Sequence, residues 1–159
     1  MFKLFRSSGV DGDDRLRPLA TLALLADLSP RELKVIAALI HHRRLLDGEV
    51  IFDEGEEGQA IYFVLSGEVM ICRQGQVGQP IARVQAGQAF GELALLDGGP
   101  RSAQARAVGD CELGVMFRGD FGALMESHAA IAAKISFGLA RHYAGIVRQS
   151  AAMSAEARS

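Results

Sequence analysis

Two side chains of opposite charge, Glu92 and Arg101, lie in one short segment that is rich in glycine. Residues 91–103 read Gly-Glu-Leu-Ala-Leu-Leu-Asp-Gly-Gly-Pro-Arg-Ser-Ala. An arginine fork can neutralise a singly charged phosphodiester, and the free amides at a helix start add dipoles of the right sign. A carboxylate is unsuited to a phosphate, but it accepts hydrogen bonds strongly from the hydroxyl groups of a sugar. The segment therefore predicts a ligand with a hydroxyl end and an anionic end.

The residue order in this segment also resembles that of a known family. Phe90–Leu95 followed by Pro100–Ala103 is similar to the phosphate-binding cassette of cyclic nucleotide-binding domains, which occur in kinase regulatory subunits, channels and bacterial catabolite activators. The alternative is a surface helix and turn with an incidental Glu–Arg ion pair, which contributes only about 0–1 kcal/mol. Such a pair would not require the glycines and the Pro-Arg step in this order.

The resemblance implies a role for each part of the cassette. Glu92 would accept from the ribose 2′-hydroxyl and Arg101 would bind the cyclic phosphate. Backbone amides of Leu93, Ala94 and Ser102 would surround the phosphate oxygens. The candidate ligand-binding residues of the cassette are Gly91, Glu92, Leu93, Ala94, Arg101, Ser102 and Ala103.

The resemblance also implies which residues would contact the base. Ile71 and Ile81 align with strand positions that line the purine, although β-branched residues also fill ordinary sheet cores. Tyr143, Ile146 and Val147 on a long C-terminal helix would face the base if that helix closes as a lid. These apolar groups do not read the purine edge, so we expect cAMP as the ligand and keep cGMP as the alternative.

Composition narrows the classes of function. A net charge of −2 gives no electrostatic case for binding nucleic acid or an anionic membrane, and no apolar run approaches the roughly 20 residues that span a bilayer. The two cysteines, Cys72 and Cys111, have no metal-site spacing, so we expect reduced structural thiols and a cytoplasmic protein. No metal cluster or catalytic set of side chains is apparent, which favours a non-enzymatic role.

Around the cassette, the sequence predicts a tail over residues 1–18 and a helical lead-in over 19–43. One helix is expected over Leu19–Leu28 and a second from Pro30 to about His42, with Ser29 and Glu32 forming a capping box.

Residues 45–117 carry short apolar runs separated by Gly-bearing turns, a spacing typical of an antiparallel barrel or sandwich. The expected strands are Val50–Phe52, Ile61–Leu65, Val69–Cys72, Ile81–Val84 and Leu113–Phe117. With the resemblance, the expected fold is α+β and mainly β. It is an eight-stranded antiparallel jelly-roll barrel with N-terminal helices, a short cassette helix and a long C-terminal helix.

Residues 118–150 predict two helices, a short one over Arg118–Glu126 and a long one from Ala129 to about Ser150, before a tail over 151–159. The apolar stripe of the long helix packs on the barrel in one interpretation. In the other, Leu139 and Ile146 belong to a seam that pairs with a second copy of the chain.

The resulting hypothesis covers residues 19–150 as one cyclic nucleotide-binding domain. We expect a stand-alone sensor that signals through its C-terminal helix to an effector protein, since residues 151–159 leave no room for a helix-turn-helix. The alternative is a protein-interaction module on the same fold with an empty pocket or another anionic ligand.

Overall fold

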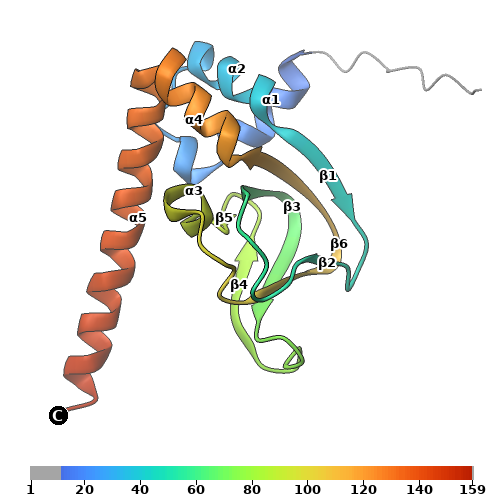
Figure 1. Cartoon of the computed structure of the whole chain (residues 1–159), viewed down its shortest axis with the longest axis vertical. Helices are drawn as coiled ribbons and strands as arrows, with labels where there is room; N and C mark the ends of the chain where they lie inside the picture. The colour runs from blue at the N-terminus through green and yellow to red at the C-terminus, as the bar shows by residue number, and fades with distance from the viewer. Residues whose placement is uncertain (1–11, 159) are drawn as a thin grey trace, which may run out of the picture.

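The fold is a curved antiparallel sheet with helices gathered at one end and one long helix along its side (Figure 1). The computed structural model describes residues 12–158. In chain order the elements are α1 (Gly12–Ala20), the 3₁₀ helix η1 (Ala23–Leu25), α2 (Pro30–Leu39), β1 (His41–Leu45), β2 (Val50–Phe52), β3 (Ala60–Cys72), β4 (Pro80–Gln85), β5 (Ala89–Phe90), α3 (Leu93–Asp97), β6 (Gln104–Phe117), α4 (Arg118–Ser127) and α5 (Ala129–Glu156).

The start of α2 is fixed by its own side chains. The Ser29 hydroxyl accepts from the Glu32 amide, and the Glu32 carboxylate accepts from the Ser29 amide, so the predicted capping box is confirmed. Glu32 also accepts from Lys134 of α5 at 2.8 Å, and this lysine lowers the pKa of the Glu32 carboxyl. The helix stops at Leu39, before the expected end near His42, because β1 begins there.

The single helix predicted over Leu19–Leu28 is wrong. The chain leaves α1 and makes the short helix η1 instead. Leu19 at the end of α1, Leu22 before η1 and Leu25 at the end of η1 are all buried, so the break in the helix still brings these leucines into the core.

Parts of both expected tails are helical. Helix α1 already begins at Gly12, while the rest of the predicted N-terminal tail, residues 1–11, lies outside the described residues. At the other end α5 continues to Glu156, so most of the segment 151–159 is helical.

The sheet contains six strands within residues 12–158, in the order β1-β6-β3-β4, with β2 paired to β6 and β5 paired to β3. All pairings are antiparallel. The α+β class, the N-terminal helices, the cassette helix and the long C-terminal helix agree with the prediction, but the closed eight-stranded barrel does not. Strand β3, of 13 residues, joins two of the expected strands, and β6, of 14 residues, extends the expected strand Leu113–Phe117 back to Gln104.

Gly67 explains the miscounted strands. The expected strands Ile61–Leu65 and Val69–Cys72 are one strand, β3, and Gly67 lies inside it at φ +83°. The pairing with β6 shifts register around this residue, so the strand bends without ending. A Cβ at Gly67 would lie 2.6 Å from the carbonyl oxygen of Asp110 and 2.7 Å from Cβ of Cys111, which leaves room only for glycine.

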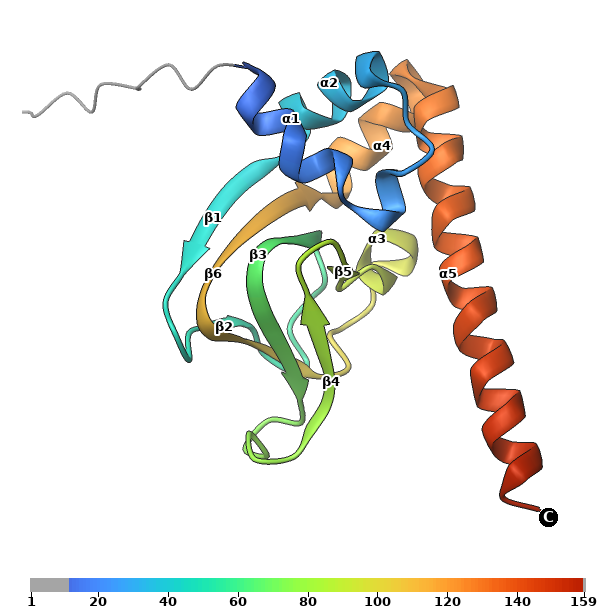
Figure 2. The same cartoon turned by 180° about the vertical axis from the view of Figure 1, so that it is seen from behind.

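Helix α5 packs on the core through its first half, and most side chains of its second half are exposed. Ile131, Ile135 and Leu139 are buried with the N-terminal helices and one end of the sheet. Only the C-terminal end of the helix extends past the rest of the molecule, and α3 lies between α5 and the sheet (Figures 1 and 2). Ile146 and Val147 are exposed by 43% and 66%. Within residues 12–158, no helix is both long enough and apolar enough to span a membrane.

Candidate nucleotide-binding site

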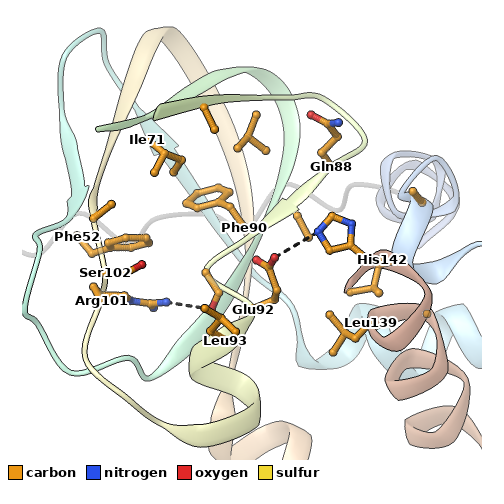
Figure 3. Close-up of a pocket in the computed structure, with 18 of the residues that line it drawn as sticks. Phe52, Ile71, Gln88, Phe90, Glu92, Leu93, Arg101, Ser102, Leu139 and His142 are labelled. Atoms are coloured by element: carbon orange, nitrogen blue, oxygen red, sulfur yellow. Dashed lines mark hydrogen bonds and ion pairs between the residues drawn. The ribbon is translucent and has the colours of Figure 1, made fainter. Parts of the chain in front are cut away.

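One cavity of about 950 Å³ opens between the sheet, the segment that holds α3, and α5 (Figure 3). Its walls come from β3 and β4, from residues 88–103, from η1 and the loop after it, and from the middle of α5. A cavity of this size fits a nucleotide-sized ligand.

Arg101 is buried at one end of the cavity, with 8% of its surface exposed. Its guanidinium donates to the carbonyl oxygens of Gly91 at 2.9 Å and Ala60 at 2.8 Å, and lies 4.1 Å from the centre of the Phe52 ring. Burial lowers the pKa of Arg101, although an arginine stays charged at neutral pH. Among the described residues, no carboxylate lies within ion-pair distance of this cation. A buried cation that has no carboxylate partner is suited to binding an anionic ligand.

The backbone around Arg101 is shaped for this position. Gly91 has φ +71°, and a Cβ there would lie 2.7 Å from Nη1 of Arg101, so glycine makes room for the guanidinium. After α3 the Asp97 carboxylate accepts from the Gly99 amide at 2.8 Å and holds the turn. The Arg101 amide then donates to the Glu56 carbonyl at 2.7 Å, which attaches the returning chain to the β2–β3 loop.

Glu92 precedes α3 and lies at another part of the same cavity (Figure 3). Its Oε1 is 3.4 Å from Nε2 of His142 in α5, and only 16% of the Glu92 side chain is exposed. The Tyr143 hydroxyl beside it is buried and has no hydrogen-bond partner within residues 12–158. Burial, and then the nearby Glu92 carboxylate, raise the pKa of Tyr143. A ligand hydroxyl at this position would donate to the Glu92 carboxylate and lie next to α5.

The remaining wall is apolar. Ile71, Ala82, Val84 and Phe90 line it, and Phe90 stacks on Tyr62 with ring centres 5.2 Å apart. Directly opposite residues of paired strands share a face, and the register places Ala82 opposite Ile71. This wall suits a flat heteroaromatic ring.

Most of the candidate residues lie together. Seven of them line the cavity: Ile71, Gly91, Glu92, Leu93, Arg101, Ser102 and Ala103. Ala94 follows Leu93 in α3. Ile81 is 58% exposed and does not line the cavity, a place taken by its strand neighbours Ala82 and Val84.

Helix α5 contributes different residues from those expected. Leu139 and His142 line the cavity, whereas Tyr143 and Ile146 do not. The i, i+3 spacing of Leu139 and His142, which places both on one helix face, was the signal available in the sequence. Gly138 of α5 also lines the cavity, and a Cβ there would lie 3.1 Å from a methyl group of Leu24, so its absence allows close packing.

Other lining residues carry no signal in the sequence, because distant strands and loops bring them in: Phe52, Arg83, Gln88 and Asp27. Among residues 12–158, no group of three or more His, Cys, Asp or Glu side chains is placed to hold a metal ion.

Comparison with known proteins agrees with this geometry. A family profile described as "Cyclic nucleotide-binding domain" matches residues 42–128. The "Cyclic AMP receptor protein" of Thermus thermophilus is 39% identical over 120 residues, which cover 74% of this chain and 56% of that protein. The "cAMP-dependent protein kinase regulatory subunit" of Emericella nidulans is 36% identical over 107 residues, which cover 67% of this chain and 26% of that subunit.

A solved structure is similar over most of the chain. The crystal structure of the Thermus thermophilus catabolite activator protein superposes with a TM-score of 0.70 at 36% identity, covering 83% of this chain and 63% of that one. The chain therefore spans less than two thirds of each of these relatives.

Proposed function

Because the chain belongs to the family of cyclic nucleotide-binding domains, we propose that its cavity binds a cyclic nucleotide and that α5 transmits the binding event. The proposal rests on two residues that line the same cavity. Arg101 is a buried cation with no carboxylate within ion-pair distance among the described residues, and Glu92 offers a shielded carboxylate. This pairing matches a ligand with an anionic phosphodiester and a free ribose hydroxyl.

The geometry supports one orientation of the ligand. The phosphodiester lies against the Arg101 guanidinium and the Ser102 backbone, and the ribose 2′-hydroxyl donates to Glu92. The purine then lies along the apolar wall that contains Ile71 and Phe90. Water is largely excluded at Arg101, so the charge-assisted contact with phosphate is stronger there than at the surface.

We favour cAMP over cGMP as the ligand. The two relatives named above carry cyclic AMP in their names, and the wall beside Ile71, Ala82 and Val84 is apolar. The apolar side chains of this wall offer no hydrogen-bond partner to the exocyclic amino group of guanine.

The proposed output is a movement of α5 that an effector protein reads, with no catalytic step in the domain itself. Both cysteines are free and buried, which suits a reducing compartment such as the cytoplasm.

The second half of α5 is also the proposed dimer contact. Leu139 does not belong to this seam because it is 3% exposed inside the core, a correction to the sequence-based hypothesis. Ile146 and Met153 are exposed by 43% and 71% and lie one heptad apart, as seam residues do.

Calorimetric titration of the full chain with cAMP, cGMP and 5′-AMP tests the proposal. Cyclic AMP should bind most tightly and 5′-AMP most weakly, since a dianionic open phosphate does not match a single arginine. Absence of binding by both cyclic nucleotides would overturn the assignment and leave the interaction module with an empty pocket, or one with another anion.

A further inference from the structure

His142 places a titratable side chain of α5 against the carboxylate that faces the cavity. Its ring lines the cavity, and its Nε2 lies 3.4 Å from Oε1 of Glu92 (Figure 3). The His142 side chain is 51% exposed, so protons reach it, whereas Glu92 is shielded. Of the four histidines in the chain, the other three are His41, His42 and His128, and none of these lines the cavity.

The other charged groups around this part of the cavity are already engaged or lie further along it. Asp27, in the loop after η1, pairs with Arg141 of α5, and Arg83 of β4 pairs with Glu68. The remaining neighbours are Asp97 at the end of α3, the Tyr143 hydroxyl on α5 and the carbonyl-bound Arg101. Glu92 is the carboxylate within ion-pair distance of His142 among the described residues.

This arrangement matters for an anionic ligand. A phosphodiester that enters the cavity meets the attraction of Arg101 and the repulsion of Glu92. A protonated imidazole on Glu92 offsets that repulsion. It also holds one carboxylate oxygen, so that the other is oriented to accept from a ribose hydroxyl.

Resting on the proposed function, we infer that His142 is a positioning residue for the nucleotide: its imidazolium neutralises and orients Glu92, and nucleotide binding is therefore linked to proton uptake. The sign follows from charge. The protonated form of His142 favours the anionic ligand, so affinity is highest at low pH and falls as the pH rises and the imidazole loses its proton.

Calorimetric titration of the full chain with cAMP at about pH 5.5 and about pH 8.0 tests this inference. We expect affinity to be roughly fivefold higher at the lower pH in the wild-type protein. His142→Gln should bind with one affinity at both pH values, near the weaker wild-type value. His142→Lys, which keeps the charge, should bind at both with an affinity near the stronger one.

The matched control is His42→Gln on the exposed strand β1, which should keep the wild-type pH profile. A double-mutant cycle with Glu92→Gln separates positioning from a direct contact, because effects that add independently would show that His142 does not act through Glu92. Tight binding with a flat wild-type profile, or a slope that survives in His142→Gln, would overturn this inference alone. Binding of neither cyclic nucleotide at either pH would overturn the proposed function, and this inference with it.

Discussion

At the scale of the residue, Arg101 is the group on which the proposed function depends. It contacts two backbone carbonyls and an aromatic ring, so its side chain is already held in place before a ligand arrives. The energetic cost of ordering a flexible cation is thereby removed from the binding step.

Arg101→Ala should reduce cAMP affinity by about 30-fold or more, since removing a buried charge-assisted contact typically costs about 2–5 kcal/mol. Arg101→Lys should weaken binding less, because it keeps the charge but loses the fork geometry. Arg106→Ala is the matched control, as Arg106 is also on the returning chain and donates to the Gly48 carbonyl at 3.0 Å but does not line the cavity. Calorimetry measures affinity, and thermal unfolding checks that each variant folds. Equal losses in the Arg101 and Arg106 variants would contradict the assignment.

Glu92→Gln should weaken cAMP binding less than Arg101→Ala, because an amide oxygen still accepts from a hydroxyl. The decisive comparison is between cAMP and 2′-deoxy-cAMP. Wild type should prefer the ribose form, and Glu92→Gln should lose most of that preference. Glu112→Gln, which removes a carboxylate paired with Arg44 on β1, should keep it. A preference unchanged by Glu92→Gln would mean that this carboxylate does not hold the ribose.

At the scale of the element, the cassette was predictable and the identity of its helical neighbours was not. Glu92 and Arg101 were found from charge and glycine spacing within one segment. His142 and Phe52 reach the cavity from α5 and β2, and only tertiary packing sets which of their faces points inward. The same holds for Ile81, since strand alternation allowed either face and the register chose Ala82 to lie opposite Ile71.

Helix α5 should respond to ligand in its second half. Its buried residues, Ile131, Ala132, Ile135 and Leu139, hold the first half in the core, so we expect movement in the part beyond them. Hydrogen exchange of the full chain should reveal new protection over residues 141–148 when cAMP binds, with little change in β3 and β6. A chain that ends at Ala140 keeps the core contacts but lacks His142, so it should fold and bind cAMP more weakly. Equal affinity in the shortened chain, with no change in exchange, would show that α5 is neither lid nor relay.

At the scale of the whole molecule, the sequence predicted the α+β fold class and the placement of helices before and after the sheet. It did not predict that the sheet is open and has six strands within residues 12–158. Glycine turns at Gly48, Gly55, Gly75 and Gly87 were correctly placed, since each has a positive φ. Gly67 carries the same conformation inside a strand, where it permits a close approach to Asp110. A glycine in the sequence does not distinguish these two uses, and the strand count depends on the distinction.

The free half of α5 predicts a dimer in solution. Light scattering should give the mass of two chains for wild type, and Ile146→Glu combined with Met153→Glu should give the mass of one. Buried charges at two seam positions one heptad apart are not tolerated. Ala151→Glu, on another side of the helix, is the control and should stay dimeric. A wild-type protein that is monomeric at high concentration would contradict the proposed dimer contact through α5.

The most direct test of the central claim is a crystal structure of the full chain with cAMP. The account predicts nucleotide density in the cavity, with phosphate oxygens within hydrogen-bond distance of the Arg101 guanidinium and the ribose 2′-hydroxyl on Glu92. It also predicts the purine against Ile71 and Phe90. A cavity that stays empty in the presence of saturating cAMP, or a nucleotide bound elsewhere with Arg101 still on its carbonyl partners, would contradict it.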